Sequence, residues 1–256
     1  MNEIKTIAVC GKGGVGKTSL AALLVAEMSR ELRKRILAID ADPASGLALS
    51  LGVTVLKTID DIRREIVGRL RERAGDDRSV VSELLDYEVF HALAEGSNTA
   101  LLAIGRPEDA GCYCRVNALL RDIIADLAEN FDIVVIDGEA GVEQINRRVM
   151  ERVDYLLIVS DLSAKGIAVS RTIWHLIHDN RALSPRGVGL VLNRGRSDRE
   201  VSEVLRDSPV ELLGWIPEDE HIRNLDISGT PLTEIPRTAP SMTVVRNILH
   251  RLSIGY

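Results

Sequence analysis

The sequence predicts an α/β protein whose doubly wound, mainly parallel sheet is flanked by helices. Short, continuous apolar runs recur along the 256 residues, and such runs are typical of strands buried in parallel sheets. Stretches with helical spacing separate most of these runs, and strand–helix alternation places helices on both faces of a parallel sheet. A Gly-rich loop joins the first apolar run to the first helical stretch, as it does in phosphate-binding folds.

The first part of the chain is expected to supply four strands. Their apolar runs cover residues 7–9, 35–40, 99–104 and 131–137. Amphipathic spacing predicts helices over 18–33 and 115–129. Residues 57–95 are charged and carry Ile59, Ile62 and Ile66 at helical spacing, so we expect a helical insertion there.

The second part is expected to complete a sheet of seven strands. Further apolar runs cover residues 155–159, 188–192 and 211–216. An amphipathic helix is expected over 241–252, where Val245, Ile248 and Leu249 share one face. Since no repeat, low-complexity stretch or linker interrupts this pattern, residues 1–256 are expected to form a single domain.

Composition excludes several classes of function. Apolar residues make up 45% of the chain and charged residues 27%, which is ordinary for a globular protein. The net charge of −6 argues against nucleic-acid binding, which would need a local basic patch. No apolar run approaches the ~18 residues of a membrane span, and Met1 leads almost directly into the first strand, without a signal peptide. With three cysteines and no disulfide framework, we expect a cytoplasmic protein that binds neither nucleic acid nor membrane.

The strongest motif is Gly-x-x-x-x-Gly-Lys-Thr, which follows the first predicted strand and opens the first predicted helix. Glycines lack Cβ, so such a loop can turn its N–H groups inward around phosphates, and the helix start adds its positive end. Lys17 is expected to reach the β- and γ-phosphates, and the Thr18 hydroxyl to bind Mg²⁺. The expected nucleotide contacts are Gly11, Gly13, Gly14, Val15, Gly16, Lys17, Thr18 and Ser19.

Carboxylates follow two of the predicted strands. Asp137 ends the run at 131–137, where it could accept hydrogen bonds from water bound to Mg²⁺ and complete the site begun by Thr18. Asp40 and Asp42 lie in Asp-Ala-Asp-Pro at the end of the run at 35–40. Each of these carboxylates could instead cap the turn that follows it.

A Cys-x-Cys pair, Cys112 and Cys114, lies immediately before the amphipathic helix at 115–129. Thiolates are soft ligands that suit zinc, nickel, Cu(I) or an iron–sulfur cluster, and the helix start and Arg115 would favour the thiolate form. Two ligands do not complete a tetrahedral site, but two chains meeting face to face would supply four. The pair could also be incidental, and Cys10 is expected to be a small buried residue, not a third ligand.

In their order along the chain, these motifs resemble those of the CooC-type ATPases. That family comprises nickel-insertion accessory proteins of carbon monoxide dehydrogenase within the superfamily of MinD, ParA and the nitrogenase iron protein. The resemblance rests on a deviant Walker A loop with a second lysine, Lys12, and on Asp-x-Asp-Pro, Gly-Cys-Tyr-Cys and Ile-Asp-Gly-Glu-Ala-Gly-Val-Glu at 136–143. It covers nearly the whole chain except 57–95, and Cys-x-Cys is its distinguishing element.

The resemblance implies roles for individual residues in a single P-loop ATPase domain. Lys12 would reach the nucleotide of the partner chain in an ATP-dependent homodimer, and it joins Lys17 and Asp42 as a catalytic candidate. Asp42 would position the attacking water, whereas Asp40 would lie nearer the Mg²⁺. Asn193 and the backbone after Pro217 would recognise adenine, which favours ATP hydrolysed to ADP and phosphate, although Asn193 could be a plain turn residue.

The function implied by this family is that of a nickel metallochaperone. Cys112 and Cys114 of both chains would bind Ni²⁺, or Zn²⁺ in its place, and the protein would deliver nickel to carbon monoxide dehydrogenase, with ATP hydrolysis as the switch. One alternative is a MinD- or ParA-like ATPase that positions itself on membrane or DNA, although the last predicted helix has few basic residues. Another is a maturation factor for a different metalloenzyme, such as acetyl-CoA synthase. His175 and His178, three residues apart, are weaker metal candidates.

Overall fold

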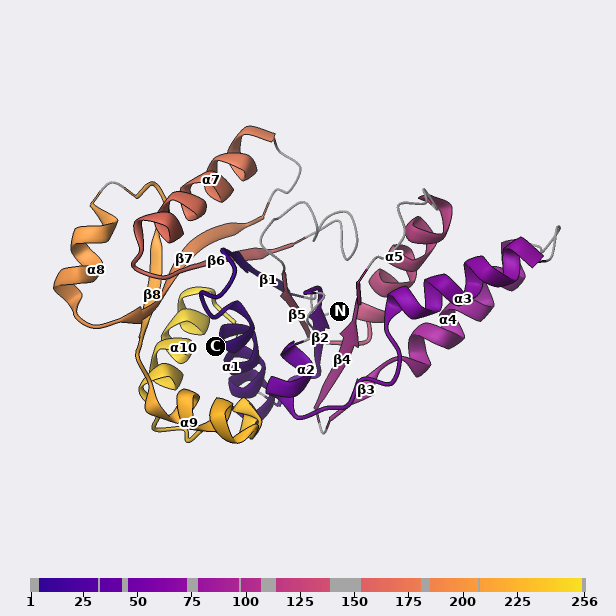
Figure 1. Cartoon of the computed structure of the whole chain (residues 1–256), viewed down its shortest axis with the longest axis horizontal. Coiled ribbons are helices and arrows are strands. Elements are labelled where there is room, and N and C mark those ends of the chain that lie inside the picture. The colour runs from indigo at the N-terminus through magenta and orange to yellow at the C-terminus, as the bar shows by residue number, and fades with distance from the viewer. Residues whose placement is uncertain are drawn as a thin grey trace.

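A computed structural model of the chain describes residues 5–31, 33–42, 46–72, 78–96, 98–106, 114–138, 153–180, 185–206 and 208–254. Within these residues the chain forms an eight-stranded sheet in the order β3-β4-β2-β5-β1-β6-β7-β8 (Figure 1). All neighbouring strands in it are parallel except the β3–β4 pair.

The strands are β1 (Lys5–Gly11), β2 (Ile36–Asp40), β3 (Ala94–Glu95), β4 (Thr99–Ala103), β5 (Ile133–Asp137), β6 (Tyr155–Ser160), β7 (Gly187–Gly195) and β8 (Leu212–Pro217). The helices are α1 (Lys17–Glu31), α2 (Gly46–Leu51), α3 (Ile59–Glu72), α4 (Arg78–His91), α5 (Cys114–Ala128), α7 (Ala164–Asn180), α8 (Asp198–Leu205), α9 (Glu220–Ser228) and α10 (Pro240–Arg251). A short 3₁₀ turn covers Leu232–Glu234.

Helices cover both faces of the sheet, as strand–helix alternation predicts. One hydrophobic core joins the sheet to α1, α2 and α10, and a second core joins it to α3, α4, α5, α7 and α8. β1 contributes to both, since Ile7 and Val9 point into the first core whereas Ala8 and Cys10 point into the second. Burial on two faces explains why the central strands are continuous apolar runs.

Each of the seven strands expected from the sequence is present, and β3 is an additional one. The expectation that residues 57–95 are helical is therefore wrong at their end, where Ala94 and Glu95 pair antiparallel with Leu101 and Ala100. Gly96 N–H donates to the Thr99 carbonyl at 2.6 Å and closes the turn between β3 and β4. A two-residue strand is too short to show an alternating pattern, so the sequence carries little signal for it.

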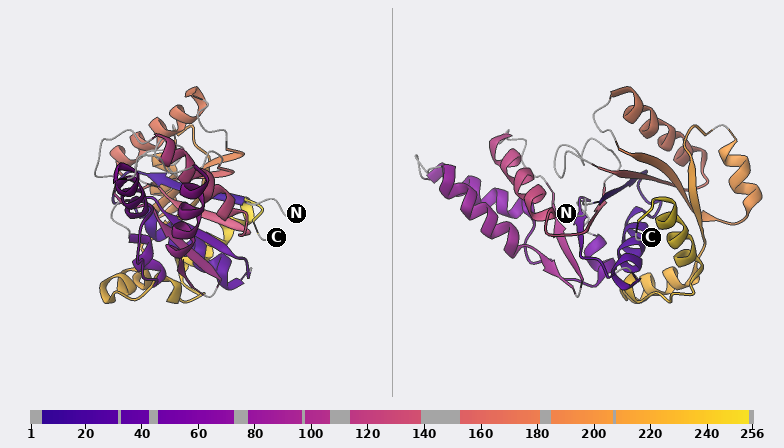
Figure 2. Two further views of the ribbon diagram at one scale, coloured as in Figure 1. Left: turned by 90° about the vertical axis from the view of Figure 1, so that its right-hand side faces the viewer. Right: turned by 180° about the vertical axis from the view of Figure 1, so that it is seen from behind.

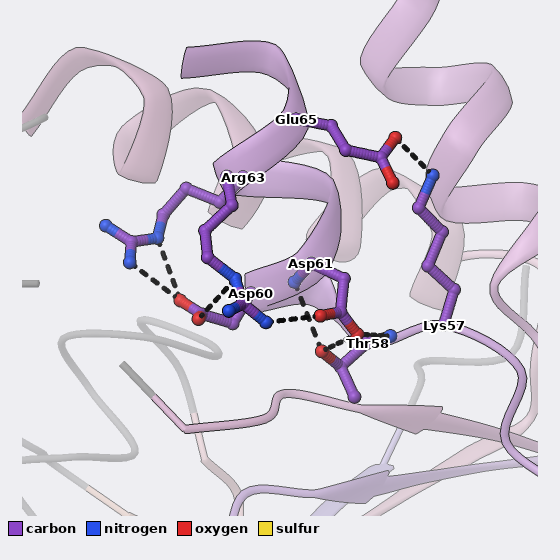
Figure 3. A network of polar contacts seen from close by, with 7 residues as sticks. Lys57, Thr58, Asp60, Asp61, Arg63 and Glu65 are labelled. Atoms are coloured by element: carbon purple, nitrogen blue, oxygen red, sulfur yellow. Dashed lines mark hydrogen bonds and ion pairs between the residues drawn. The ribbon is translucent and has the colours of Figure 1, made fainter. Parts of the chain in front are cut away.

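The rest of that segment forms a helical hairpin of α3 and α4, which extends outward from the β4 side of the sheet and packs on α5 (Figures 1 and 2). Thr58 caps α3, since its hydroxyl accepts from Asp61 N–H at 3.2 Å and Asp61 Oδ2 accepts from Thr58 N–H at 2.9 Å. Lys57 Nζ links the two helices by binding Glu65 of α3 at 2.7 Å and Glu88 of α4 at 2.6 Å. Figure 3 shows this network, apart from Glu88, at the base of α3.

None of the helices among the described residues is long and apolar enough to cross a membrane.

Candidate functional site

The Gly-rich loop of residues 12–16 connects β1 to α1 at the carboxyl edge of the sheet. β1 lies between β5 and β6, and the chain runs to one side of β1 through β2, β4 and β5 before it crosses to β6, β7 and β8 on the other side. Such a crossover point leaves a crevice beyond the strand ends, where ligands of open α/β sheets bind.

Three glycines give this loop its shape. Gly11 has φ = 145°, and a Cβ there would lie 2.1 Å from the Val159 carbonyl oxygen of β6. Gly16 has φ = 93°, and a Cβ there would lie 2.1 Å from Asn193 Nδ2. Gly14 also has a positive φ of 79°, but nothing lies within 4 Å of its Cβ position. The loop therefore packs tightly on the sheet at its two ends and faces open space between them, as a phosphate cradle must.

The two lysines of the loop have different surroundings. Lys17 is buried, with 7% of its surface exposed, and its Nζ donates to the Lys12 carbonyl at 3.4 Å. Lys12 is more exposed, and its Nζ lies 3.7 Å from Oδ2 of Asp161, the residue that follows β6. Lys17 thus closes the cradle from inside, whereas Lys12 points to the neighbouring strand end.

Asp40 and Asp137 are the last residues of β2 and β5 and lie directly opposite each other in the sheet. Both are fully buried. Asp40 accepts backbone hydrogen bonds from Asp42 N–H at 3.2 Å and from Leu47 N–H at 3.0 Å, so it caps the turn into α2. The two carboxylate oxygens of Asp137 are buried without a hydrogen-bond partner among the residues described. Asp40 therefore caps the turn that follows β2, whereas no capping bond to Asp137 is seen among the residues described.

Burial dominates the acidity of this carboxylate pair. It raises the pKa of Asp137 to about 7, and the Asp40 charge adds to that rise, while the nearby Thr18 hydroxyl and Lys17 ammonium oppose it. Burial likewise raises the pKa of Asp40 to about 6, against the backbone N–H groups of Leu47, Asp42 and Ala48 that lower it. The Lys17 charge is therefore too weak to offset the effect of desolvation on the pKa of Asp137, and the backbone N–H groups are too weak to offset it for Asp40.

This arrangement fits a hard divalent cation. Asp137 offers two buried oxygens with no hydrogen-bond partner within the described ranges, and the Thr18 hydroxyl lies near enough to affect its pKa. Mg²⁺ prefers oxygen ligands of this kind and usually keeps waters that such carboxylates accept from. Asp42, which follows β2 and is partly buried, lies two residues from Asp40 at the same edge.

Asn193 and Pro217, the residues expected to contact the adenine base, lie near the ends of β7 and β8. Asn193 pairs with Ile216 in the register of the two strands, and Gly195 pairs with Pro217. The Asn193 amide donates to the Val15 carbonyl at 2.8 Å, so this side chain also braces the Gly-rich loop. A hollow of about 530 Å³ adjoins the two strand ends; its lining residues are Leu162, Arg194, Arg196, Glu200, Glu203, Val204 and Glu218.

Known proteins are similar to this chain in sequence and in fold. The family model described as the CobQ/CobB/MinD/ParA nucleotide binding domain matches residues 6–232. The chain belongs to this family. It is an ATP-binding ATPase of the MinD/ParA type, and the predicted fold class is confirmed.

Three known proteins illustrate the similarity of this chain to others in sequence or structure. An uncharacterized ATP-binding protein of Methanocaldococcus jannaschii is 36% identical over 251 residues, which cover 96% of this chain and 97% of that protein. The carbon monoxide dehydrogenase accessory protein CooC of Rhodospirillum rubrum is 31% identical, over 87% of each chain. The structure of MinD from Pyrococcus horikoshii, complexed with Mg-ADP, superposes with a TM-score of 0.70 over 98% of this chain and 96% of that one, at 22% identity.

The cysteine pair lies at the boundary of the described residues. Cys112 falls outside them, and Cys114 is the first residue of α5. No cluster of three or more metal-ligating side chains occurs in the part of the chain that the structure describes. Cys10 is buried in β1, as expected, and burial raises the pKa of its thiol to about 12.

One residue beside the loop was not among the expected site residues. Asp161 places Oδ2 near Lys12, while its Oδ1 accepts from Ser163 N–H at 3.2 Å at the start of α7. The signal for it was available, because Asp161 follows a buried strand just as Asp40 and Asp137 end theirs. What the sequence lacks is the strand order that puts β6 beside β1.

Proposed function

We propose that this ATPase is a metallochaperone that helps to insert nickel into carbon monoxide dehydrogenase. The proposal rests on one combination: a chain 31% identical to CooC over 87% of its length carries a Cys-x-Cys pair at the start of α5. Thiolates at such a position suit a soft or borderline metal ion that is held transiently and then passed on.

ATP binding is assigned to the loop between β1 and α1. In this proposal Lys17 and the loop N–H groups hold the phosphates, and Thr18, Asp40 and Asp137 hold Mg²⁺. Bound Mg²⁺ would supply positive charge that offsets the charge of the phosphates and of the two buried carboxylates. Asp42 orients the attacking water, a role that needs position more than basicity. Asn193 and the backbone after Pro217 recognise adenine, and the bond from Asn193 to Val15 ties base recognition to the loop.

Nucleotide binding would control a homodimer. Lys12 would leave Asp161 and reach the phosphates of the partner chain, which brings two identical surfaces together about a two-fold axis. Cys112 and Cys114 of both chains would then supply four thiolates to one metal ion, the number that a closed tetrahedral site needs. Hydrolysis would relax the dimer and so release the metal to the client, with nickel as the cargo and zinc as a competitor for the same thiolates.

A nickel titration tests the metal site. In the presence of ATP and Mg²⁺, wild type is expected to bind one Ni²⁺ per dimer, and Cys112→Ser/Cys114→Ser is expected to bind none. Cys10→Ser is the matched control, since its thiol is buried in β1 and should leave nickel affinity unchanged. Unchanged nickel affinity in the double variant would overturn the proposed site.

Sedimentation velocity tests the switch. Wild type with ATP is expected to dimerise, Lys17→Ala to stay monomeric because it does not hold the phosphates, and Lys12→Ala to bind ATP yet stay monomeric. A Lys12→Ala dimer formed as readily as that of wild type would show that this lysine has no role across the interface.

The alternative of a membrane- or DNA-positioning ATPase finds little support in α10. Its Arg246 lies 3.6 Å from Glu27 of α1, and Arg251 Nη1 donates to the Leu212 carbonyl at 2.7 Å. Basic groups engaged in this way do not form the free cationic face that such binding requires. Cosedimentation with anionic liposomes or with DNA would distinguish the two functions.

A further inference from the structure

The outer side of α4 carries a compact, exposed surface. Five residues share one face of the helix, here called the α4 outer face, because four of them lie three, four, seven and eight residues after the first: Glu83, Asp86, Tyr87, Phe90 and His91. All five are exposed, with 60% of Tyr87 and 61% of Phe90 accessible. The chain has only two phenylalanines; the other, Phe131, packs against the core. The exposure of two neighbouring aromatic side chains, Tyr87 and Phe90, indicates an interaction surface.

The rings of the α4 outer face form one continuous aromatic surface. The ring of His91 contacts both of the others: its centroid is 4.2 Å from that of Tyr87, at an interplanar angle of 54°. Phe90 meets the same imidazole edge-on, with centroids 6.0 Å apart. Contacts of this kind restrain the rings before any partner arrives, which lowers the conformational entropy lost on binding.

The helix that carries this face is held in place by packing and ion pairs. On the inner side of α4, Leu85 and Val89 are fully buried in the core shared with α3 and α5. Lys57 joins α4 to α3 through Glu88 and Glu65, at the base of the hairpin. Aromatic anchors on a packed helix are the side chains that contribute most to protein–protein affinity.

Charge indicates the kind of partner that fits. Glu83 and Asp86 flank the rings, and α4 has no lysine or arginine among its described side chains, residues 82–91. Arginine or lysine side chains of a partner would pair with these acids and stack on Tyr87 and Phe90. A second copy of this chain fits poorly, since an isologous contact would set the same acidic residues against each other.

The base of the hairpin is bonded to the candidate ATP site. Asp60 N–H, in the first turn of α3, donates to the Ile104 carbonyl at 2.9 Å, and Ile104 N–H donates to the Asp40 carbonyl at 2.8 Å. A partner docked on the hairpin is therefore held by the same rigid unit that carries Asp40. We propose that the α4 outer face docks a basic segment of the client enzyme, an inference that rests on the proposed metallochaperone function.

Calorimetric titration with purified carbon monoxide dehydrogenase tests the docking face. Tyr87→Ala/Phe90→Ala and Glu83→Lys/Asp86→Lys are each expected to weaken binding by about tenfold or more, given the usual weight of aromatic and charged anchors. Ile227→Ser on α9 is the matched control, because this residue is 73% exposed on another helix and should leave affinity unchanged. Binding by wild type should also weaken as salt is raised, since it depends on ion pairs.

Equal affinity of wild type and Tyr87→Ala/Phe90→Ala would overturn the proposal, as would a wild type that does not bind the dehydrogenase. It would also fail if the aromatic variant altered ATP-dependent dimerisation in sedimentation, since the face would then belong to a second copy of this chain. Nickel-dependent activation of the dehydrogenase separates this proposal from the proposed function. If wild type and the aromatic variant activate the enzyme equally, only the docking face is wrong; if wild type does not activate it, the proposed function is wrong.

Discussion

Asp40 and Asp137 are two buried acids set side by side, and the folded protein tolerates them at a cost in stability. Their pKa values are raised to about 6 and about 7, above the value near 4 of an unfolded carboxyl group. At a pH between the unfolded and the folded pKa values, these two carboxyl groups bind more protons in the folded state than in the unfolded state. For these two groups, the free energy of unfolding of the nucleotide-free protein therefore falls as pH rises from about 4 to about 7.

Asp137→Asn tests this consequence, because an amide imitates the protonated acid at every pH. At pH 4, close to the pKa of the unfolded acid, the variant and wild type are expected to differ by less than about 1 kcal/mol in urea denaturation. At pH 8 without Mg²⁺ the variant should be more stable by a few kcal/mol, since one pKa unit corresponds to about 1.4 kcal/mol. Saturating Mg²⁺ and ATP should narrow or reverse the difference. A constant difference across this pH range would contradict the assignment of the raised pKa to Asp137.

Gly11 and Gly13 provide a matched pair of substitutions in the Gly-rich loop. Gly11→Ala would place Cβ 2.1 Å from the Val159 carbonyl oxygen in a backbone conformation with φ = 145°, and both strands are held by the sheet. We expect it to lower the free energy of unfolding by about 3 kcal/mol or more. Gly13→Ala meets no atom within 4 Å and should change it by less than about 0.5 kcal/mol. Equal denaturation midpoints for the two variants would show that the contact with Val159 is not as tight as described.

At the scale of elements, α3 depends on the turn that begins it. The Thr58 hydroxyl accepts from Asp61 N–H and donates to Asp61 Oδ2 at 2.6 Å. These bonds hold the pKa of Asp61 below its usual range, against a smaller opposing effect of burial. Gly105, at the end of β4, has a positive φ of 83°, and a Cβ there would lie 2.6 Å from Thr58 Oγ1. The hairpin can therefore approach β4 only because residue 105 has no side chain.

Thr58→Ala removes this cap, and we expect it to destabilise the protein by about 1 kcal/mol, the usual cost of losing a threonine N-cap. Hydrogen exchange should increase first in α3, where the freed N–H groups lie. Thr54→Ala is the control, since Thr54 is exposed and precedes the hairpin. A similar loss of stability in both variants would argue against a specific capping role.

Most strands were predictable because each is buried on both faces and reads as one apolar run. The 3.6-residue period likewise predicted α5 and α10, since each buries one face against the sheet, and it predicted α1 although residues 20–28 of that helix are all buried. The two-residue β3 was missed because it is too short to carry a period. The sequence also did not predict that Asp40 and Asp137 lie opposite each other. Their proximity depends on the strand order, which places β2 beside β5. The motif residues Lys17 and Thr18 needed no such information, because they are neighbours in the chain.

At the scale of the whole molecule, the ion pair between Lys12 and Asp161 opposes the proposed dimer. Lys12 must give up Asp161, at 3.7 Å, before it can reach another chain, and both side chains are 29% exposed. An ion pair as exposed as this contributes between 0 and about 1 kcal/mol. Each chain of the proposed dimer gives up one such pair, so the two pairs together change the dissociation constant of the dimer by about 30-fold at most.

Asp161→Asn removes the pair from both chains and is expected to lower that dissociation constant by up to about 30-fold in sedimentation with a non-hydrolysable ATP analogue. Glu220→Gln on α9 removes an equal charge from an exposed position and should have no effect. A weaker dimer in Asp161→Asn would mean that Asp161 contributes to the interface instead of competing with it.

The central place of β1 also determines when this protein can first bind its nucleotide. β1 is made first, yet its neighbours in the sheet are β5 (Ile133–Asp137) and β6 (Tyr155–Ser160). A ribosome that adds about 5–20 residues per second needs roughly 7–30 s to travel from the first strand to the sixth. Until then the nascent Gly-rich loop lacks both Val159, against which Gly11 packs, and Asn193, which braces Val15. Nucleotide capture is thus a late event in biogenesis, and ATP cannot assist the folding of the N-terminal half while that half is being synthesised.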